Sequence, residues 1–511
     1  MKDKYLVINC GSSSVKFQLF ELPEQKVIAK GTVERIGKEN CEWTIKAGDL
    51  VIKDTHELKS HVEAVKVILD TLLKNEIVKD LKEIKGIGHR VLHGGTLYKD
   101  SAIIDEKVLQ DIIDLTPLGP LHHPGEIEGI LCMQKLLPGV PNVAVFDTAF
   151  HQSIPRKNYE YPIPEEWRAK GARSYGFHGT SVKFITEYMQ KKLKKKNVNL
   201  IVCHIGSGAS ITAVKWGKSY VTTMGLTPLD GLMMGTRSGS IDPSLLEFMQ
   251  RVTGKSLAEL LDDLNTKSGL YGISGKNDYR DIEKAASEGD ENAQLALEMF
   301  TSRVVDTISK FYTQLDGHVD GIIFTAGIGE NAYKFRESVI NELPLFMDCR
   351  LDEKINENIA SFKVQQEGMI SEKNARCKAY VVPTDEEKMI MLDTYRLVNG
   401  ASKLDEENLS FDEIDKRSKV EKEKYELSLI AFYLQNYMSL YTEVINDMEN
   451  YHEVDIREIF NEMLSRNQEL WLDYTEDISA LGYSDYNDIL ENRLNIIRER
   501  EAKEAKSGKS L

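Results

Sequence analysis

The sequence of 511 residues predicts an α/β protein built from a duplicated domain, with a separate helical extension at its C-terminal end. Up to about residue 398, apolar strand-like runs alternate with helical patterns, as is typical of α/β folds. Two stretches about 195 residues apart share one order of strand, Gly/Ser turn and strand. The length exceeds what one hydrophobic core usually supports, which predicts two or three domains.

The individual elements follow from runs of apolar residues and their spacing. The runs expected to form strands include 5–9, 86–92, 142–147, 199–206, 209–214, 321–327 and 379–383. The segments expected to form helices include 61–75, 244–262 and 291–316.

The first of the two similar stretches, VINCGSSSVKFQLF at 7–20, predicts a hairpin with a small, Ser-rich turn followed by Lys16. Such a turn suits phosphate, but it does not match the GxxxxGK[ST] loop and no helical pattern follows it. The second stretch, IVCHIGSGASITAV at 201–214, predicts another hairpin. A third glycine turn, FTAGIGEN at 324–331, would let backbone N–H groups approach a phosphate or nucleoside. We therefore expect a phosphate-facing hairpin in each half of a duplicated fold.

The composition limits the classes of partner. The formal net charge of −16 argues against nucleic acid as the main partner, since phosphate backbones need a basic face, although a nucleotide needs only a few local donors. No run of 18 apolar residues predicts a membrane span, and the N-terminus has no apolar signal segment. Six cysteines without CxxC spacing are expected to be free thiols. These features predict a cytoplasmic protein.

The C-terminal segment differs from the rest. Residues 401–511 contain 14 Lys and Arg against 26 Asp and Glu, a net charge of −12, and have amphipathic helical spacing. We expect a linker at 399–420, an acidic helical extension at 421–500 and a disordered tail at 501–511. The extension is interpreted as a small helical bundle, a module that binds a protein partner or modifies the oligomer, or a partly disordered segment.

A series of motifs in order carries a resemblance to a known family. The motifs are NCGSSSVK, GHRVLHGG, PLHHP, VFDTAFHQ, YGFHGTS, HIGSGASITAV, MGTRSGSIDP, FTAGIGEN and VPTDEE. In this order, over residues 5–395, they resemble the acetate kinases. The resemblance implies two actin-like (ribonuclease H-like) domains with an interdomain cleft. The first would span 1–148 and be completed by about 386–398, and the second, nucleotide-binding domain would span 149–385.

The resemblance also implies an activity and its catalytic residues. The reaction would be reversible, Mg²⁺-dependent transfer of phosphoryl between ATP and acetate, giving acetyl phosphate and ADP by direct in-line transfer. Arg90 and Arg237 would clamp the carboxylate and the migrating phosphoryl group, because planar guanidinium groups match oxyanions. His178 would donate a hydrogen bond to that group. Asp147 would orient an arginine or a metal-bound water, because a carboxylate substrate is already ionised and needs no base.

The remaining assignments rest on the same resemblance. The acyl and substrate pocket would contain Arg90, Leu92, Leu121, His122, Phe177 and Pro228. Nucleotide contacts would come from Ser12, Ser14, Lys16, His204, Ile205, Gly206, Ser207, Gly208, Asp278, Tyr279, Arg280, Gly327, Ile328, Gly329, Glu330 and Asn331. Asn9 and Glu386 would hold Mg²⁺ or Mn²⁺. The family resemblance implies a homodimer.

Several positions depart from the pattern that is usual in the family. Leu92 replaces a frequent Val, and Val182 replaces a frequent His. His123 and Ser207 each replace a frequent Asn, and Ser240 replaces a frequent Asp. Leu92 is bulkier than Val and predicts discrimination against larger acyl chains. Two alternatives stay open: a propionate or butyrate kinase, and an actin-like nucleotide-binding scaffold whose tail recruits a partner.

Overall fold

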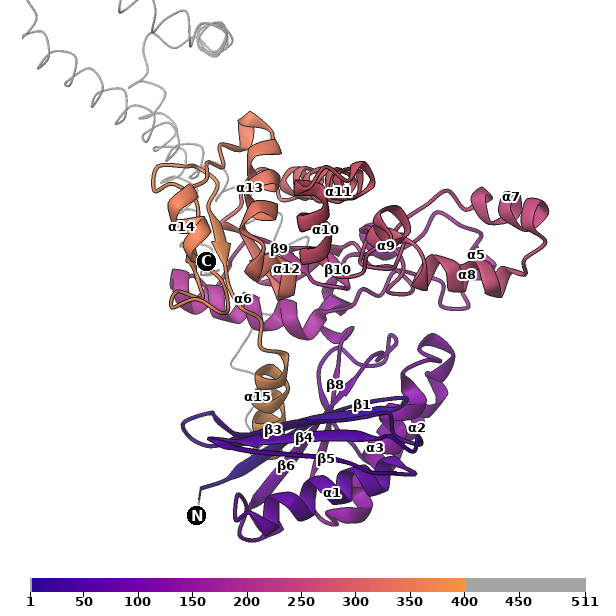
Figure 1. Cartoon of the computed structure of the whole chain (residues 1–511), viewed down its shortest axis with the longest axis vertical. Helices are drawn as coiled ribbons and strands as arrows, with labels where there is room; N and C mark the ends of the chain where they lie inside the picture. Colours follow the sequence, from indigo (N-terminus) through magenta and orange to yellow (C-terminus); the bar gives the residue numbers. More distant parts are fainter. Residues whose placement is uncertain (1, 401–511) are drawn as a thin grey trace, which may run out of the picture. The chain divides into compact units, whose positions relative to one another are not determined.

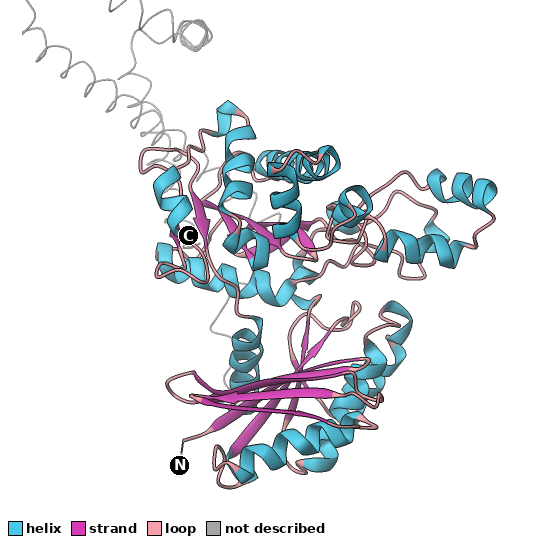
Figure 2. Cartoon of the chain, in the orientation of Figure 1, coloured by secondary structure: helices cyan, strands magenta, loops and turns pink. Residues whose placement is uncertain are grey.

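The computed structural model describes residues 2–400, in which strands and helices alternate around two mixed β-sheets (Figures 1 and 2). The α/β class predicted from the sequence is therefore confirmed for this part of the chain. The predicted acidic helices at 421–500 and the tail at 501–511 lie outside the described residues, as does the linker beyond Gly400.

The first sheet has eight strands in the order β5-β4-β3-β2-β1-β6-β8-β7. Its strands are β1 Lys4–Gly11, β2 Ser14–Glu21, β3 Lys26–Glu34, β4 Glu42–Ala47, β5 Leu50–Thr55, β6 Ile84–Val91, β7 Ala102–Ile103 and β8 Asn142–Phe146. Leu6 and Ile8 of β1 pack with α1 (His61–Lys74) and α3 (His123–Leu136), whereas Tyr5 and Val7 pack with α15 (Glu386–Val398). Alternate residues of a strand point to opposite faces, so the sheet has helices on both sides (Figure 1).

The second sheet has six strands in the order β11-β10-β9-β12-β14-β13. Its strands are β9 Leu200–Ile205, β10 Ala209–Lys215, β11 Lys218–Thr222, β12 Gly321–Thr325, β13 Gly368–Met369 and β14 Ala379–Val381. Val182 and Ile185 of α6 (Gly179–Leu193) pack on this sheet together with Ile323. The other helices are α2 Glu106–Asp114, α4 Arg156–Tyr159, α5 Glu165–Arg168, α7 Ser244–Thr253, α8 Leu257–Thr266, α9 Gly269–Ser274, α10 Tyr279–Ser287, α11 Glu291–Gln314, α12 Ala326–Asn331, α13 Tyr333–Glu342 and α14 Glu353–Asn358.

The two predicted hairpins are both present and occupy equivalent places in the two sheets. β1 pairs with β2 and β9 pairs with β10, in each case antiparallel across the Gly/Ser turn. The second strand of each hairpin pairs antiparallel with the strand that follows it, β2 with β3 and β10 with β11. The first strand of each hairpin pairs parallel with a later strand, β1 with β6 and β9 with β12. The order β3-β2-β1-β6-β8 therefore repeats as β11-β10-β9-β12-β14, which confirms the duplication.

Two local predictions were wrong. The single helix expected at 244–262 is two helices, α7 and α8. Gly254 ends α7 in the left-handed region at φ +73°, and Ser256 then begins α8 with a capping box to Glu259. The glycine turn expected at 324–331 is the end of β12 followed by the short helix α12.

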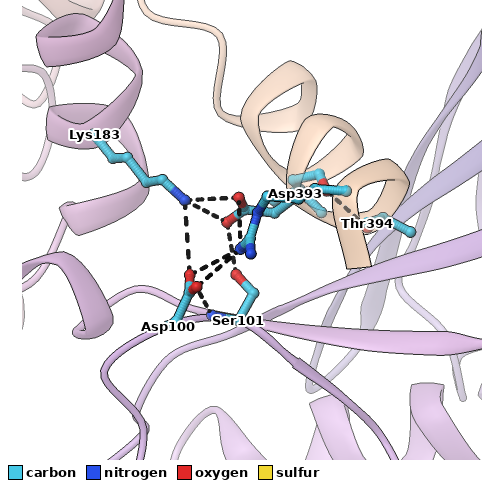
Figure 3. A network of polar contacts seen from close by, with 7 residues as sticks. Asp100, Ser101, Lys183, Asp393 and Thr394 are labelled. Carbon is cyan, nitrogen blue, oxygen red and sulfur yellow. Dashed lines mark hydrogen bonds and ion pairs between the residues drawn. The ribbon is translucent and has the colours of Figure 1, made fainter. Parts of the chain in front are cut away.

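A network of charged side chains connects α15, α6 and the loop before β7 (Figure 3). Lys183 Nζ lies 2.7 Å from both carboxylate oxygens of Asp393, which is 3% exposed, and the Ser101 hydroxyl donates to the same carboxylate at 2.6 Å. Arg396 donates to both oxygens of Asp100 at 3.0 Å. These contacts join segments almost 300 positions apart in the chain.

Replacing Asp393 by alanine is expected to lower the free energy of unfolding by about 3 kcal/mol. The change removes the acceptor of Lys183 and Ser101 and leaves a largely buried ammonium group whose remaining carboxylate neighbour, Asp100, lies 3.9 Å away. The matched control is Lys107→Ala, because Lys107 pairs with Asp111 but its side chain is 78% exposed, and we expect a loss below about 1 kcal/mol. Urea unfolding measures both, and equal losses would contradict the role given to the network.

Candidate active site

An arginine and an aspartate meet where two parallel strands of the first sheet end. Arg90 lies near the end of β6, and Asp147 directly follows β8, which pairs with β6 in register. Arg90 Nη2 donates to Asp147 Oδ2 at 2.9 Å, so two of the four residues predicted to be catalytic form an ion pair. The carboxyl ends of parallel strands are a common location for functional side chains in α/β proteins.

Asp147 is 1% exposed and ionised. Burial alone would raise its pKa, but the nearby Arg90 cation and His178, whose backbone N–H donates to Oδ2 at 3.2 Å, outweigh burial and lower the pKa. The second carboxylate oxygen, Oδ1, is buried without a hydrogen-bond partner in the described residues. Asp147 is therefore held as a carboxylate with one oxygen available to a ligand.

His178 sits at the N-terminal end of α6 in a left-handed conformation, with φ +59° and ψ +21°. This conformation is uncommon for a non-glycine residue, and such residues are concentrated at functional sites. Its Nδ1 lies 2.9 Å from the hydroxyl of Ser210, and its ring stacks on that of His204 with centroids 4.0 Å apart. The ring is thus fixed by a hydrogen bond and by stacking.

Both stacked histidines are neutral near pH 7. Burial, followed by the neighbouring His204, lowers the pKa of His178 well below its ordinary value, and burial lowers the pKa of His204 to about 4. His204 Nδ1 lies 2.9 Å from the Ser181 hydroxyl, which lies 2.7 Å from the hydroxyl of Thr384. These contacts fix His204 from α6 and from the segment before α15.

Arg237 points toward the second hairpin and has no carboxylate partner among the described residues. Its closest polar contacts are the Pro228 carbonyl at 3.5 Å and the Met234 sulfur at 3.8 Å. A Cβ added to Gly208 would lie 3.6 Å from both Arg237 Nη1 and His178 Nε2. Burial lowers the pKa of Arg237, but at neutral pH the side chain remains a half-buried cation. Arg237 and His178 therefore converge on the space beside Gly208.

The predicted acyl-pocket residues differ widely in exposure. Leu92 and Phe177 are buried, Pro228 is half-buried, and Leu121 is 81% exposed. An acyl pocket that includes Leu121 therefore has an open side in this structure. His122 is half-buried at the start of α3, and burial together with Arg90 and Arg237 lowers its pKa.

Glu126 was not predicted as a site residue. This carboxylate of α3 is 3% exposed, and both of its oxygens accept the Leu92 backbone N–H, at 3.1 and 3.2 Å. Burial raises its pKa to about 7, although the Arg90 cation and the Leu92 N–H oppose the rise. Glu126 thus fixes the backbone of a predicted acyl-pocket residue close to Arg90. The sequence offered only an acidic residue within PLHHPGE, with no motif that identifies it.

Replacing Glu126 by glutamine is expected to flatten the pH dependence of the free energy of unfolding. The folded carboxyl keeps its proton up to about pH 7, whereas in the unfolded chain it ionises near pH 4.5. Between these two pH values the folded state binds more protons than the unfolded state. The free energy of unfolding therefore falls as the pH rises through this range, by up to about 1.4 kcal/mol per pH unit. Glutamine cannot titrate but keeps an acceptor for Leu92. Urea unfolding between about pH 5 and pH 8 measures the slopes, and identical slopes in both proteins would contradict this assignment.

The glycine-rich segments of the second sheet lie close together. A Cβ on Gly206 would approach Gly327 N at 3.9 Å, and a Cβ on Gly327 would meet no atom of the described chain. Open space at a glycine permits a ligand to approach the backbone closely. Glu330 instead uses its side chain internally, because Oε1 accepts the backbone N–H groups of Ala326 and Thr384. Asn331 likewise bonds to Gly327 O and to Ser361.

The predicted nucleotide residues of KNDYRD have structural roles of their own. Asp278 caps the N-terminus of α10 and pairs with Arg280 at 2.6 Å on the surface. The ring of Tyr279 packs against those of Phe300 and Phe335. These contacts hold the segment in place, and nucleotide binding there stays a prediction.

The predicted metal ligands form a sparse set of oxygen donors. Glu386 is the first residue of α15, half-buried, and burial together with Asp147 raises its pKa to about 7. Asn9, on β1, lines a pocket that Glu387 also lines. The described residues contain no group of three His, Cys, Asp or Glu that could hold a metal. A few oxygens, with the free Oδ1 of Asp147 nearby, suit Mg²⁺, which takes most of its ligands from water and phosphate.

The first hairpin presents its predicted phosphate residues in two ways. Ser12 is exposed in the turn, and Ser14 is half-buried at the start of β2. Lys16 points from β2 into the same pocket as Asn9, on the face of the sheet that bears α15. Gly125 of α3 packs so closely on the turn that a Cβ there would lie 2.7 Å from the Gly11 carbonyl.

Comparison with known proteins identifies the family. A family model described as the acetokinase family matches residues 4–392. The chain belongs to this family. The acetate kinase of Thermotoga maritima is 48% identical over 402 residues, covering 77% of this chain and 98% of its own length, and that of Bacillus subtilis is 47% identical over 398 residues, covering 77% and 99%. The resemblance stated from the motifs is thus confirmed.

Solved structures of the family have the same fold. The acetate kinase of Porphyromonas gingivalis gives a TM-score of 0.74 at 38% identity, covering 78% of this chain and all of that one. A propionate kinase from Francisella tularensis gives 0.72 at 42% identity, covering 77% and 99%. These likenesses agree with the predicted pair of duplicated actin-like domains. Among the residues that the structure describes, no helix is both long and apolar enough to span a membrane.

Proposed function

We propose that this protein is an ATP-dependent acetate kinase that transfers phosphoryl reversibly between ATP and acetate. One observation carries the proposal: the half-buried Arg237 has no carboxylate partner in the described chain and converges with His178 on the space beside Gly208. A cation held partly out of water without a counter-charge is suited to bind an anion. Membership of the acetokinase family supports a phosphoryl group next to a carboxylate as that anion.

The reaction needs no proton transfer. An ionised acetate oxygen attacks the γ-phosphorus of ATP, the bond from that phosphorus to the bridging oxygen breaks, and ADP leaves with the electron pair. Catalysis therefore depends on alignment and on neutralising negative charge. Arg237 would neutralise the migrating group from one side, and Arg90, oriented by Asp147, would hold the carboxylate.

His178 acts as a neutral donor in this proposal. Its low pKa keeps the ring uncharged, and the contact of Nδ1 with Ser210 sets the direction of Nε2 toward Gly208. A neutral ring that donates from Nε2 has an unprotonated Nδ1, so in this proposal Nδ1 accepts a hydrogen bond from the Ser210 hydroxyl. A neutral donor fixed by stacking on His204 requires little reorganisation as charge moves onto the phosphoryl oxygens.

We propose Mg²⁺ as the metal, with Mn²⁺ as its substitute, held by Asn9 and Glu386. When bound, the ion supplies charge neutralisation for the nucleotide phosphates. A cation at Glu386 would lower the pKa that burial and Asp147 raise to about 7. The nucleotide would lie along the backbone of 204–208 and 327–331, where Gly327 has open space.

Propionate is the second candidate substrate, because the Francisella propionate kinase is as similar in structure as the acetate kinase from Porphyromonas. A buried apolar wall such as Leu92 discriminates between acids by crowding, which contributes about 1–3 kcal/mol per methylene. We expect acetate to be preferred over propionate, and propionate over butyrate, in kcat/KM.

Replacing Leu92 by alanine is expected to raise the ratio of propionate to acetate kcat/KM by about tenfold, since the change removes crowding next to Arg90. A coupled ADP-release assay over acetate, propionate and butyrate measures the ratio in both proteins. If the wild type prefers butyrate to acetate by about tenfold, the acetate assignment is wrong. If the ratio is the same in the variant and in the wild type, Leu92 does not line the acyl pocket.

A cytoplasmic homodimer is proposed for the assembly. Large apolar side chains are exposed together on α7 and α8, and such clusters mark interaction surfaces. They are Leu245, Phe248, Val252, Leu257 and Leu261. The proposed role of 401–511 in binding a protein partner concerns residues outside the described part.

A further inference from the structure

A basic pocket lies on the first sheet and extends from Asn9 and Lys16, which the proposed kinase site also uses, to lysines that the kinase site does not use. It has a volume of about 410 Å³ and is formed by β1 to β5 and the start of α15. Its lining contains four lysines, one carboxylate and uncharged polar side chains. These are Lys16, Lys30, Lys46, Lys53, Glu387, Asn9, Gln18, Thr32 and Thr44.

Strand register places these side chains in two rows across the sheet. One row runs from Asn9 through Lys16, Thr32 and Thr44 to Lys53, each the Cα partner of the next. The neighbouring row brings Gln18 opposite Lys30 and Lys30 opposite Lys46. Side chains two residues apart on a strand share a face, so both rows point into the pocket.

The charge of the pocket is only partly balanced within the described chain, where Asp385 interacts electrostatically with Lys30. None of the four lysines makes an ion pair there, and Glu387 is the one carboxylate in the lining. The acidic residues of these strands, Glu21, Glu34, Glu42 and Asp54, all lie outside the lining, and Glu42 pairs with Arg35.

The direct pairing of Lys30 with Lys46 opposes stability. Like charges placed opposite each other on neighbouring strands are destabilising, and Lys30 and Lys46 are direct Cα partners. The pocket is cationic although residues 1–400 as a whole are acidic. Their formal charge is −4, because the chain has −16 and residues 401–511 account for −12. An arrangement that costs stability and concentrates charge in a concave site is typical of a ligand site.

The dimensions and donors define the ligand class. The volume is within the range of small-molecule sites, roughly 300–1,000 Å³, and is too small for a folded partner. Lysines act as point charges for phosphate, and Thr, Asn and Gln supply further donors. We propose that the basic pocket binds a small polyanion that carries at least two phosphate or carboxylate groups. This site goes beyond the proposed kinase reaction, and three of its lysines, 30, 46 and 53, have no part in that reaction.

Isothermal titration of the full chain with inorganic tripolyphosphate, at low salt and with a saturating non-hydrolysable ATP analogue and Mg²⁺, tests the proposal. The nucleotide analogue keeps the probe out of the nucleotide site, and the variants leave unchanged Asn9 and Lys16, which that site shares with the pocket. We expect saturable binding at one site per chain. The double variant Lys30→Ala with Lys46→Ala should bind at least about tenfold more weakly, since two charge-assisted contacts are lost. Lys30→Arg with Lys46→Arg keeps both charges and should bind within about threefold of the wild type.

Two further measurements keep the outcome clear. Lys66→Ala with Lys135→Ala removes two exposed lysines from α1 and α3, on the other face of the sheet, and should leave binding unchanged. The Lys30/Lys46 alanine variant should have an unfolding temperature equal to or above that of the wild type, because a like-charge pair is removed. Absence of binding in the presence of nucleotide, or equal weakening in the two alanine variants, would overturn the proposal.

Discussion

Replacing Arg237 by alanine is expected to lower kcat/KM by about 10³-fold without lowering the unfolding temperature. The wild-type guanidinium is half-buried and has no carboxylate partner in the described chain, where its hydrogen-bond acceptors are the Pro228 carbonyl and the Met234 sulfur. Its removal relieves a desolvated charge, so the fold has little to lose. The transition state, in contrast, loses a cation next to the migrating phosphoryl group. Steady-state kinetics and thermal unfolding of the same preparation measure both effects.

Two controls separate charge from geometry. Arg237→Lys keeps the charge but loses the planar fork, and we expect it to recover only part of the lost activity. Arg303→Ala removes an exposed arginine of α11 and should change neither measurement. A strongly reduced unfolding temperature in Arg237→Ala would show that the residue serves the fold and would contradict its assignment as an anion ligand.

Replacing Arg90 by alanine is expected to remove activity and also to destabilise the protein by about 3–5 kcal/mol at pH 8. Asp147, 1% exposed, would lose its ion-pair partner at 2.9 Å and become a buried carboxylate with only uncharged donors, the His178 N–H and the Thr180 hydroxyl. Burial would then raise the pKa of Asp147 above its unfolded value. The stability of the variant should therefore fall as the pH rises and partly recover in acid.

The double variant Arg90→Ala with Asp147→Asn distinguishes the two losses. An uncharged asparagine removes the buried charge, so we expect the free energy of unfolding to return toward the wild-type value while activity stays lost. Urea unfolding at two pH values completes the cycle. Additive destabilisation in the double variant would show that the ion pair is not what couples these residues.

The parts of the fold that sequence predicted were those encoded by neighbouring residues. Both Gly/Ser hairpins follow from short strands on either side of a small turn, and the strand ends at Arg90 and Asp147 follow from apolar runs. The helix at 244–262 was predicted as one because its apolar spacing continues through Gly254, whereas the left-handed glycine and the Ser256 cap divide it.

Features that depend on tertiary contacts were not predictable. Glu126 reaches the backbone of Leu92 from 34 positions away, and nothing in PLHHPGE indicates that contact. The left-handed conformation of His178 and its stacking on His204 arise from the packing of α6 against the second sheet. The basic pocket needs the register of five strands, which places Lys30 opposite Lys46.

The most direct test of the central claim follows the γ-phosphate of ATP by ³¹P NMR in the presence of acetate, Mg²⁺ and the full chain. The proposed arrangement of Arg90, Arg237 and His178 predicts that the resonance of an acyl phosphate appears as that of the γ-phosphate declines, at a rate about 10³-fold lower with Arg237→Ala. Inorganic phosphate as the first product, or equal rates in the two proteins, would contradict the claim.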